Sequence, residues 1–289
     1  MNYKALNTRF RAYQVGNEGS SFSYFDGSSF TLIEARLTDT NIPSIVNELK
    51  ACGKTSIDCL HITSWDTDHC MKSELEIIID RLNPKRIEYP GYLPHTDNGK
   101  DCLKIILKHN KPVKIDSNYV SSLDNATEWN YNNIIYNNSK DYESANDNSS
   151  IKLFRSGAFT VLSLGDVEKK EIADFLLRTK IIKNEVDVLI LAHHGADNGF
   201  TTKEFIQGIS PKVAICSSNY GNQYDHPRQE IRDLLYENGV TLYTTKTGDV
   251  LVKTIGDNTI AYKAINLIAN STEISSDKDF NTKRYLKWK

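Results

Sequence analysis

Long apolar runs are missing from this sequence of 289 residues. No stretch approaches the roughly 20 consecutive apolar residues that a membrane-spanning helix requires. The first residues are polar and include Lys4, Arg9 and Arg11, without the apolar segment of a secretory signal peptide. These two absences predict a cytoplasmic protein that does not associate with membranes.

Paired cysteines and an excess of positive charge are missing as well. The five cysteines are odd in number and lack metal-type Cys-x-x-Cys spacing, so we expect reduced thiols in the core. They are Cys52, Cys59, Cys70, Cys102 and Cys216. The net charge of −2 argues against strong non-specific binding to DNA, although it is compatible with a local binding groove.

What the chain does contain is an alternation of short strands and amphipathic helices, without internal repeats. With 39% hydrophobic residues it can bury one large core. An antiparallel opening over residues 9–36 precedes strand–helix units with apolar strands, which indicates sheets covered by helices. We predict one domain over residues 1–265. Within this domain, the Asn-rich residues 116–150 are expected to form a loop-rich insertion. Residues 266–289, which follow the domain, are expected to form a polar tail.

The individual elements follow from apolar periodicity and from turn residues. The predicted helices cover residues 42–51, 72–82, 101–109, 171–177 and 228–238. The predicted strands after the opening cover residues 57–62, 87–89, 113–115, 151–154, 159–164, 186–192, 213–217, 240–244 and 250–254.

A cluster of candidate metal ligands follows the apolar strand over residues 57–62. Asp66, Asp68 and His69 lie within four residues of the chain, in a loop. Their mutual repulsion and desolvation at one point could be offset by a divalent cation, which predicts metal binding. A solvated acidic loop explains Asp-x-Asp-His at least as well, so the metal hypothesis depends on similar strand ends elsewhere.

Two further strands end in residues of the same chemical type. The strand over residues 159–164 ends in a glycine followed by Asp166, and glycine lets the chain turn sharply there. The most apolar strand, over residues 186–192, ends in His193 and His194. Two adjacent imidazoles cannot both face one apolar interior, so at least one requires a polar partner. The sequence does not decide which of the two binds metal.

The loop after the strand over residues 213–217 supplies hydrogen-bonding side chains. Asn219, Tyr220 and His226 can bind a phosphate oxygen or protonate a leaving group. His226-Pro227 also fits the start of the following helix, with Pro in its first turn, and that alternative stays open.

These segments resemble the metallo-β-lactamase superfamily, and in particular its ComEC-type competence branch. The second motif of the superfamily is His-x-His-x-Asp-His, and its last two residues match Asp68 and His69. Ser64 and Asp66 stand where the family has its first and second His, which is a departure from the pattern. Asp166 matches the fourth motif, a carboxylate that bridges two metals. The resemblance implies an α/β fold, the four-layer αββα sandwich, with the site where strand ends meet.

Further matches extend the resemblance over roughly residues 9–255. The His-His-Gly signature of the competence branch occurs at residues 193–195, and residues 218–227 are similar to its Asn-x-Tyr-x-His-Pro loop. Glu34 takes the place of an Asp that supports the metal loop. His95, in a loop fixed by prolines, is a candidate for the third motif, although an exposed loop histidine explains it equally well.

The resemblance implies a metal-dependent hydrolase with two divalent cations, zinc or manganese. A water shared by cations roughly 3.5–4 Å apart would supply hydroxide near neutral pH and attack phosphorus. The implied metal ligands are Asp66, Asp68, His69, Asp166 and one or both of His193 and His194. The implied catalytic residues are Asp68 and His226. Candidates for further metal or substrate contacts are Ser64, His95, Asn219 and Tyr220.

The first functional interpretation is therefore a phosphodiesterase or nuclease whose partner is nucleic acid or a nucleotide. A hydrolase of small cyclic or modified nucleotides is the alternative enzyme. A sensor or scaffold without turnover is a different class, motivated by Ser64 and Asp66. These two residues make the first metal position richer in oxygen, which predicts more activity with Mn²⁺ than with Zn²⁺. If these two residues bind metal weakly at the first position, Ser64→His should tighten metal binding.

Overall fold

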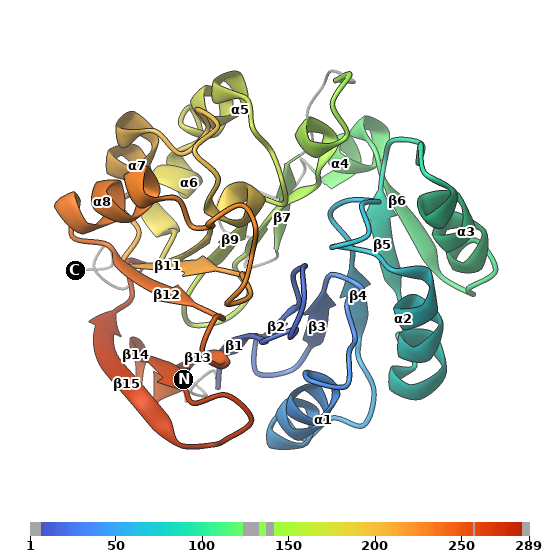
Figure 1. Ribbon diagram of the computed structural model, residues 1–289, viewed down its shortest axis with the longest axis horizontal. Helices are drawn as coiled ribbons and strands as arrows, with labels where there is room; N and C mark the ends of the chain where they lie inside the picture. Colours follow the sequence, from blue (N-terminus) through green and yellow to red (C-terminus); the bar gives the residue numbers. More distant parts are fainter. Residues whose placement is uncertain (1–6, 124–132, 137–141, 257, 285–289) are drawn as a thin grey trace.

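Two β-sheets form the centre of the molecule, and helices cover the outer side of each sheet (Figure 1). The computed structural model describes residues 7–123, 133–136, 142–256 and 258–284. The helices on one side come from the first half of the chain, and those on the other side from the second half. Their packing, described below, confirms the predicted four-layer αββα sandwich.

The first sheet has nine strands and is antiparallel on one side and parallel on the other. In chain order, its strands are β1 (Arg9–Ala12), β2 (Phe22–Phe25), β3 (Phe30–Ile33), β4 (Cys59–His61), β5 (Ile87–Pro90), β6 (Pro112–Ile115), β13 (Val250–Ile255), β14 (Asn258–Leu267) and β15 (Ile274–Asn281). Their order across the sheet is β15-β14-β13-β1-β2-β3-β4-β5-β6. Pairing is parallel from β3 to β6, where helical crossovers connect the strands, and antiparallel elsewhere.

The second sheet has six strands. They are β7 (Ile134–Tyr136), β8 (Ile151–Phe154), β9 (Val161–Ser163), β10 (Val188–Ile190), β11 (Val213–Cys216) and β12 (Thr241–Thr244). Their order is β12-β11-β10-β9-β8-β7, with parallel pairing from β9 to β12. The carboxyl ends of these parallel strands therefore lie along one edge, which is where open α/β sheets place their sites.

Helices fill the connections between the parallel strands, and one further helix, α4 (Ser117–Leu123), links β6 of the first sheet to β7 of the second. The others are α1 (Ile42–Ala51), α2 (Lys72–Ile77) continued by a π-helical turn (Ile78–Leu82), α3 (Asp97–Ile106), α5 (Lys170–Leu176), α6 (Lys180–Glu185), α7 (Lys203–Ile209) and α8 (Gln229–Glu237). Short 3-10 turns cover Asn146–Asn148 and Ala192–Gly195. Within the described part of the chain, none of the helices combines the length and apolar character that crossing a bilayer requires.

Side-chain alternation along the strands separates the core into layers. In β10, Val188 and Ile190 pack between the two sheets, whereas Leu189 packs with the helices of the second sheet. In β3, Ile33 faces the other sheet and Leu32 packs against α1–α3. Because successive strand residues point to opposite faces, strands that are apolar throughout are buried on both faces. All five cysteines are free and four of them are buried, which confirms the predicted thiols.

A buried ionic contact connects the sheets below the site. Lys152 of β8 places its Nζ 2.7 Å from a carboxylate oxygen of Glu88 in β5, and the same oxygen lies 2.9 Å from His61 Nδ1 in β4. All three side chains are buried. Removing one member would leave a buried charge without its partner, which is strongly destabilising. The contact therefore fixes β4, whose end carries the predicted metal loop, against the second sheet.

The predicted polar tail is corrected by the structure up to residue 284. Residues from 258 onward form β14 and β15, and the two strands pair antiparallel at the edge of the first sheet. The side chains of β15 are mostly exposed and carry charges of alternating sign, as at Asp277, Lys278 and Asp279. An edge strand with this composition lacks the apolar alternation that strand prediction requires, and the charges discourage edge-to-edge association.

Residues 116–150 contain more regular structure than a loop. They include α4, the edge strand β7 and a 3-10 turn, while residues 124–132 and 137–141 of the predicted insertion lie outside the described residues. Elsewhere the strands and helices agree with prediction to within a few residues. The helix predicted over residues 101–109 begins earlier, because the Thr96 hydroxyl caps it by accepting from the Gly99 N–H at 3.1 Å. Helices α6 and α7 were not predicted.

Candidate metal centre

The loop over residues 63–70 follows β4 and carries two residues of the site. Its backbone turns tightly, and the His69 N–H donates to the carbonyl of Asp66 at 2.9 Å. The N-terminal segment holds the loop from outside, through a hydrogen bond of 2.9 Å from the Ser20 N–H to the carbonyl of Asp68. These bonds fix the directions in which Asp68 and His69 project.

Asp166 reaches the site from the end of β9. Gly165, which precedes it, has a φ of +58°, and a β-carbon there would lie 2.7 Å from the side chain of Ser149. The Ser149 hydroxyl accepts a hydrogen bond from the Asp166 N–H at 3.1 Å. Glycine is therefore required for the turn that directs Asp166 inward.

His194 comes from the 3-10 turn Ala192–Gly195 at the end of β10. His193 and His194 both have a left-handed backbone, with φ of 44° and 54°. The His193 N–H donates to the carbonyl of Gly165 at 3.1 Å, which ties this turn to the one before Asp166. Successive non-glycine residues in this conformation are strained, and such strain is concentrated at functional sites.

Four predicted ligands meet between these strand ends. Asp68, His69, Asp166 and His194 each offer one ligand atom, and these atoms all lie within 4.8 Å of one another. His69 Nε2 is 2.9 Å from Oδ2 of Asp166, and His194 Nε2 is 3.2 Å from Oδ2 of Asp68. In the described ranges no other group of three such side chains converges in this way.

The second ring nitrogen of each histidine is held by an acceptor outside this four-residue cluster. His69 Nδ1 lies 3.2 Å from Oε1 of Glu34, and His194 Nδ1 donates to the carbonyl of Ser217 at 2.9 Å. This arrangement directs each Nε2 into the cluster, as in metal-binding histidines. In a neutral His194 the Nε2 lone pair then faces the carboxylate of Asp68, so a proton or a cation must lie between them.

The donor set fits a divalent cation. Two imidazole nitrogens and two carboxylates are ligands that zinc and manganese both accept. His69 Nε2 is buried and forms no well-oriented hydrogen bond with any described residue, despite its proximity to Asp166. A buried polar atom without such a bond is costly, and a cation would satisfy it. The number and identity of the cations remain predictions.

The carboxylates and the histidines of the cluster stabilise one another's charged forms. Burial opposes the charged form of Asp68, but His69 and the hydrogen bond from His194 hold the pKa of Asp68 below its ordinary value. Burial likewise opposes protonation of His69, but Asp166, Glu34 and Asp68 raise the pKa of His69 well above its ordinary value. Protons on the histidines thus occupy the place of a metal, and binding a metal would release them.

Ser64 and Asp66 lie in the same loop but turn away from the cluster. The Ser64 hydroxyl is fully buried and donates to the Asp66 carboxylate at 3.0 Å. It also lies 3.0 Å from the hydroxyl of Tyr92. The two residues at the family's first and second His positions therefore bind each other, and the geometry does not support Asp66 as a ligand.

Other candidate residues have separate surroundings. His193 Nδ1 lies 2.7 Å from a carboxylate oxygen of Glu168, so the structure places His194, and not His193, among the four converging donors. His95 is exposed at the surface and is not part of the cluster. Tyr220 is 82% exposed. Glu34 is buried and contacts His69, as its predicted supporting role requires.

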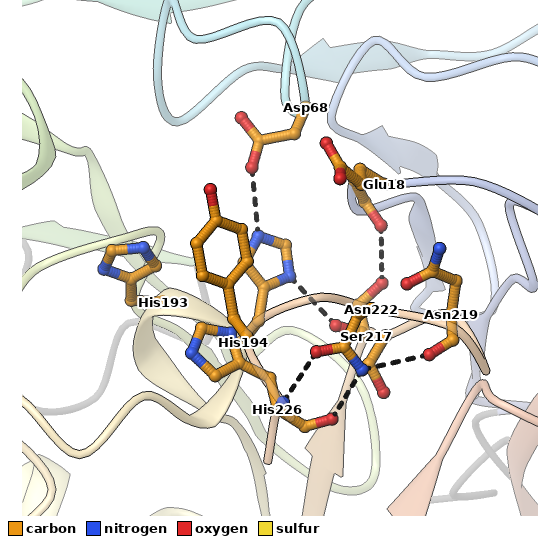
Figure 2. Close-up of a pocket in the computed structure, with 11 residues that line it drawn as sticks. Glu18, Asp68, His193, His194, Ser217, Asn219, Asn222 and His226 are labelled. Atoms are coloured by element: carbon orange, nitrogen blue, oxygen red, sulfur yellow. Dashed lines mark hydrogen bonds and ion pairs between the residues drawn. The ribbon is translucent and has the colours of Figure 1, made fainter. Parts of the chain in front are cut away.

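A pocket opens beside the cluster and has a volume of about 450 Å³, part of which is open to solvent. Figure 2 shows Asp68, His194 and His226 around it. The ring of His226 is stacked over that of His194, with centroids 6.4 Å apart and planes 10° apart. Burial, together with His194 and His193, lowers the pKa of His226 to about 4. This pocket shares Asp68 and His194 with the cluster and is open to solvent, so a ligand bound at the cluster would extend into it.

Asn222 and Tyr224 are pocket residues that the sequence analysis missed. Asn222 donates to the carbonyls of Asn219 and His226 at 3.1 Å and accepts from the His226 N–H at 2.7 Å (Figure 2). Tyr224 stacks on His226. The sequence contained the pattern that identifies these two residues. Residues 222–227 match the Asn-x-Tyr-x-His-Pro motif without a gap, whereas Asn219 and Tyr220 do not fit its spacing. Asn219 nevertheless lines the pocket.

No protein-family model matches the chain. Among curated proteins, it is 28% identical over 198 residues to ComE operon protein 3 of Bacillus subtilis, across 68% of this chain and 24% of that protein. It is 34% identical over 64 residues to competence protein ComA of Neisseria gonorrhoeae, across 22% of this chain and 9% of that protein. The chain thus matches less than a quarter of the length of each relative.

Two solved structures show weak similarity, each with a TM-score of 0.42 and 13% identity. One is a candidate metal-dependent hydrolase from Parabacteroides distasonis, with 78% of this chain and 88% of that chain covered. The other is a diphosphatase of the PhnP family, with 85% and 98% covered. The motif order, the αββα layers and the similarity to two competence proteins confirm that this chain resembles the competence branch of the metallo-β-lactamase superfamily.

Proposed function

We propose that this protein is a metal-dependent hydrolase that cleaves phosphodiesters of nucleic acid or nucleotides. The observation that carries the proposal is the convergence of Asp68, His69, Asp166 and His194 from three separate strand ends. Ionisable side chains with shifted pKa values that cluster beside a pocket are typical of functional sites. The family resemblance supports hydrolysis as that function.

The four residues of the cluster would hold the cation, through Nε2 of His69 and His194 and through the carboxylates of Asp68 and Asp166. A bound divalent cation would supply Lewis-acid chemistry, which makes water more nucleophilic and neutralises charge on phosphoryl oxygens. Glu34 and the carbonyl of Ser217 orient the two imidazoles for this task.

The chain's own residues then position the substrate. His226 lies in the pocket beside His194, and its ring can hydrogen-bond a substrate oxygen. Asn222 holds the backbone of His226 on both its N–H and its carbonyl side, which keeps the ring in place before substrate arrives.

A metal-binding sensor or scaffold without turnover is the second candidate. The observation that favours it is the contact between Ser64 and Asp66, which withdraws both residues from the cluster. The described residues then provide converging donors for one cation, where the family resemblance implies two.

The test compares metal content and turnover on the same purified samples. Bis(4-nitrophenyl) phosphate serves as a generic phosphodiester, with Mn²⁺ and Zn²⁺ supplied separately. We expect Asp166→Asn and Asp68→Asn to lose most bound metal and activity. Asp66→Asn, in the same loop but outside the cluster, should keep its metal. Equal metal loading of Asp166→Asn and the parent would refute the metal centre, whereas full loading without turnover would favour the sensor.

A further inference from the structure

The pocket beside the metal cluster has an unusual charge for a site that meets phosphates. None of its lining residues, all of them in the described ranges, is Lys or Arg. Two of them, Glu18 and Asp68, are carboxylates, and Figure 2 shows both at the same side of the pocket. A groove that follows a long nucleic-acid backbone needs positive side chains to neutralise successive phosphates. This pocket therefore suits a ligand with few phosphates.

Three aromatic rings extend outward from the cluster. His226 stacks on His194, and Tyr224 stacks on His226 with centroids 5.6 Å apart and planes 26° apart. Tyr224 is the outermost ring of the series and is 57% exposed. A large aromatic side chain held beside a pocket with this much exposure offers a flat apolar surface to a ligand.

The loop that carries Tyr224 is held on both sides. Asn222 bridges the backbone of Asn219 and His226, and the Arg228 guanidinium donates to the Tyr224 carbonyl at 3.3 Å. At its start, the Ser218 N–H donates to the Thr245 hydroxyl at 3.0 Å. A ring on a loop that is already fixed loses little freedom when a ligand stacks on it.

Hydrogen-bonding groups lie next to this ring. The Asn219 side chain lines the pocket, and within the described residues its amide has no hydrogen-bond partner. An amide donates and accepts, so it can pair with the edge of a base. The pocket thus combines an aromatic platform, a free amide and the adjoining metal cluster.

From this arrangement, and resting on the proposed function, we infer that the substrate is a short nucleotide phosphodiester whose base stacks on Tyr224. The phosphodiester lies at the cluster of Asp68, His69, Asp166 and His194. The adjacent base then occupies the outer pocket, where base–aromatic stacking tolerates any base. Glu18 disfavours additional phosphates at the mouth of the pocket, which selects dinucleotides or cyclic dinucleotides over long strands.

The test uses two matched substrates and three variants of the full chain. One substrate is deoxyadenylyl-deoxyadenosine, and the other is the same phosphodiester without either base. Tyr224→Phe keeps the ring, Tyr224→Leu removes it, and Tyr236→Leu is the control, because Tyr236 is 86% exposed on α8 and does not line the pocket. We expect Tyr224→Leu to raise KM for the dinucleotide by about tenfold or more, and Tyr224→Phe to change it by less than about twofold.

The base-free substrate separates stacking from a structural effect. If Tyr224 binds the base, Tyr224→Leu raises KM for the dinucleotide by a clearly larger factor than KM for the base-free phosphodiester, which reports only the effect passed on through His226. Equal losses on both substrates would mean that Tyr224 only supports His226, and an unchanged KM for the dinucleotide would also overturn the inference.

A binding measurement keeps the inference testable if the protein hydrolyses neither substrate. In that case the proposed function fails, and quenching of a 2-aminopurine dinucleotide still reports the base site. We expect the parent, Tyr224→Phe and Tyr236→Leu to quench its fluorescence, with about tenfold weaker binding in Tyr224→Leu. Equal binding by all four proteins would reject the base site independently of catalysis.

Discussion

Glu34 Oε1 lies 3.2 Å from Nδ1 of His69, and both side chains are buried. The other Glu34 oxygen accepts from the Thr63 N–H at 3.0 Å, so the carboxylate holds the histidine and the start of its loop together. Glu34 has a φ of 67°, a left-handed conformation that directs its side chain under the loop. Glu34 therefore acts on the cluster through His69.

Glu34→Gln should weaken metal affinity by about 10- to 100-fold, because a neutral amide replaces the carboxylate that orients the His69 ring. Metal affinity is measured by competition with a chromogenic chelator. Glu76→Gln, an exposed change on α2, is the matched control and should leave affinity unaltered. Unchanged affinity in Glu34→Gln would show that His69 is oriented without Glu34.

The structure reverses the effect that the sequence predicts for Ser64→His. Ser64 is fully buried and contacts Asp66 and Tyr92, so an imidazole has no free space there. We expect Ser64→His to lower the free energy of unfolding by about 1–3 kcal/mol through overpacking, without tighter metal binding. Urea unfolding and metal titration of the same sample check this, with Ser64→Ala as the control for lost hydrogen bonds. Tighter metal binding would instead restore the family's first metal position.

Asp225, which precedes His226, has a φ of 53°. A left-handed backbone costs about 1–2 kcal/mol for a residue with a β-carbon, least for Asn and Asp and nothing for Gly. We expect Asp225→Gly and Asp225→Asn to keep the parent's free energy of unfolding, and Asp225→Val to lower it by about 1–2 kcal/mol. Three variants of equal stability in urea unfolding would contradict this.

Asp187 gives stability a pH dependence that is separate from the metal cluster. It is fully buried before β10, and burial raises its pKa to about 7, although the N–H groups of Thr160 and Lys283 donate to it at 2.9 and 2.8 Å. In the unfolded chain the pKa is close to 3.8. The folded state therefore holds a proton that the unfolded state loses between these values.

Stability from this group is fully present below about pH 4 and falls as pH rises to about 7, by roughly 4 kcal/mol in total. Asp187→Asn has no proton to lose. We expect the difference in unfolding free energy between parent and variant to change in favour of the variant from about pH 4.5 to about pH 7.5. Asp39→Asn, an exposed change, serves as the control. A difference that does not vary with pH would show that Asp187 is ionised in the folded protein.

The sequence by itself determined where the ligand-bearing segments begin. Asp68, Asp166 and His194 each follow a short apolar strand, and an apolar run that ends in polar residues indicates the end of a strand. That these residues meet followed from the family resemblance and not from strand order alone, because β4 lies in the first sheet and β9 and β10 lie in the second. The edge strand β15 escaped prediction, because a strand that buries no face carries no apolar alternation.

Only the tertiary structure decided which of two neighbouring side chains joins the cluster. His193 and His194 are equivalent in the sequence, but different partners hold their rings. Glu168 contacts His193 and Ser217 contacts His194, each from a segment more than 20 residues away. Asp66 and Asp68 also differ through distant partners. Tyr92 contacts the Ser64 hydroxyl that holds Asp66, and His194 contacts Asp68. A side chain's direction depends on the partners that distant elements bring to it, and no local pattern contains those partners.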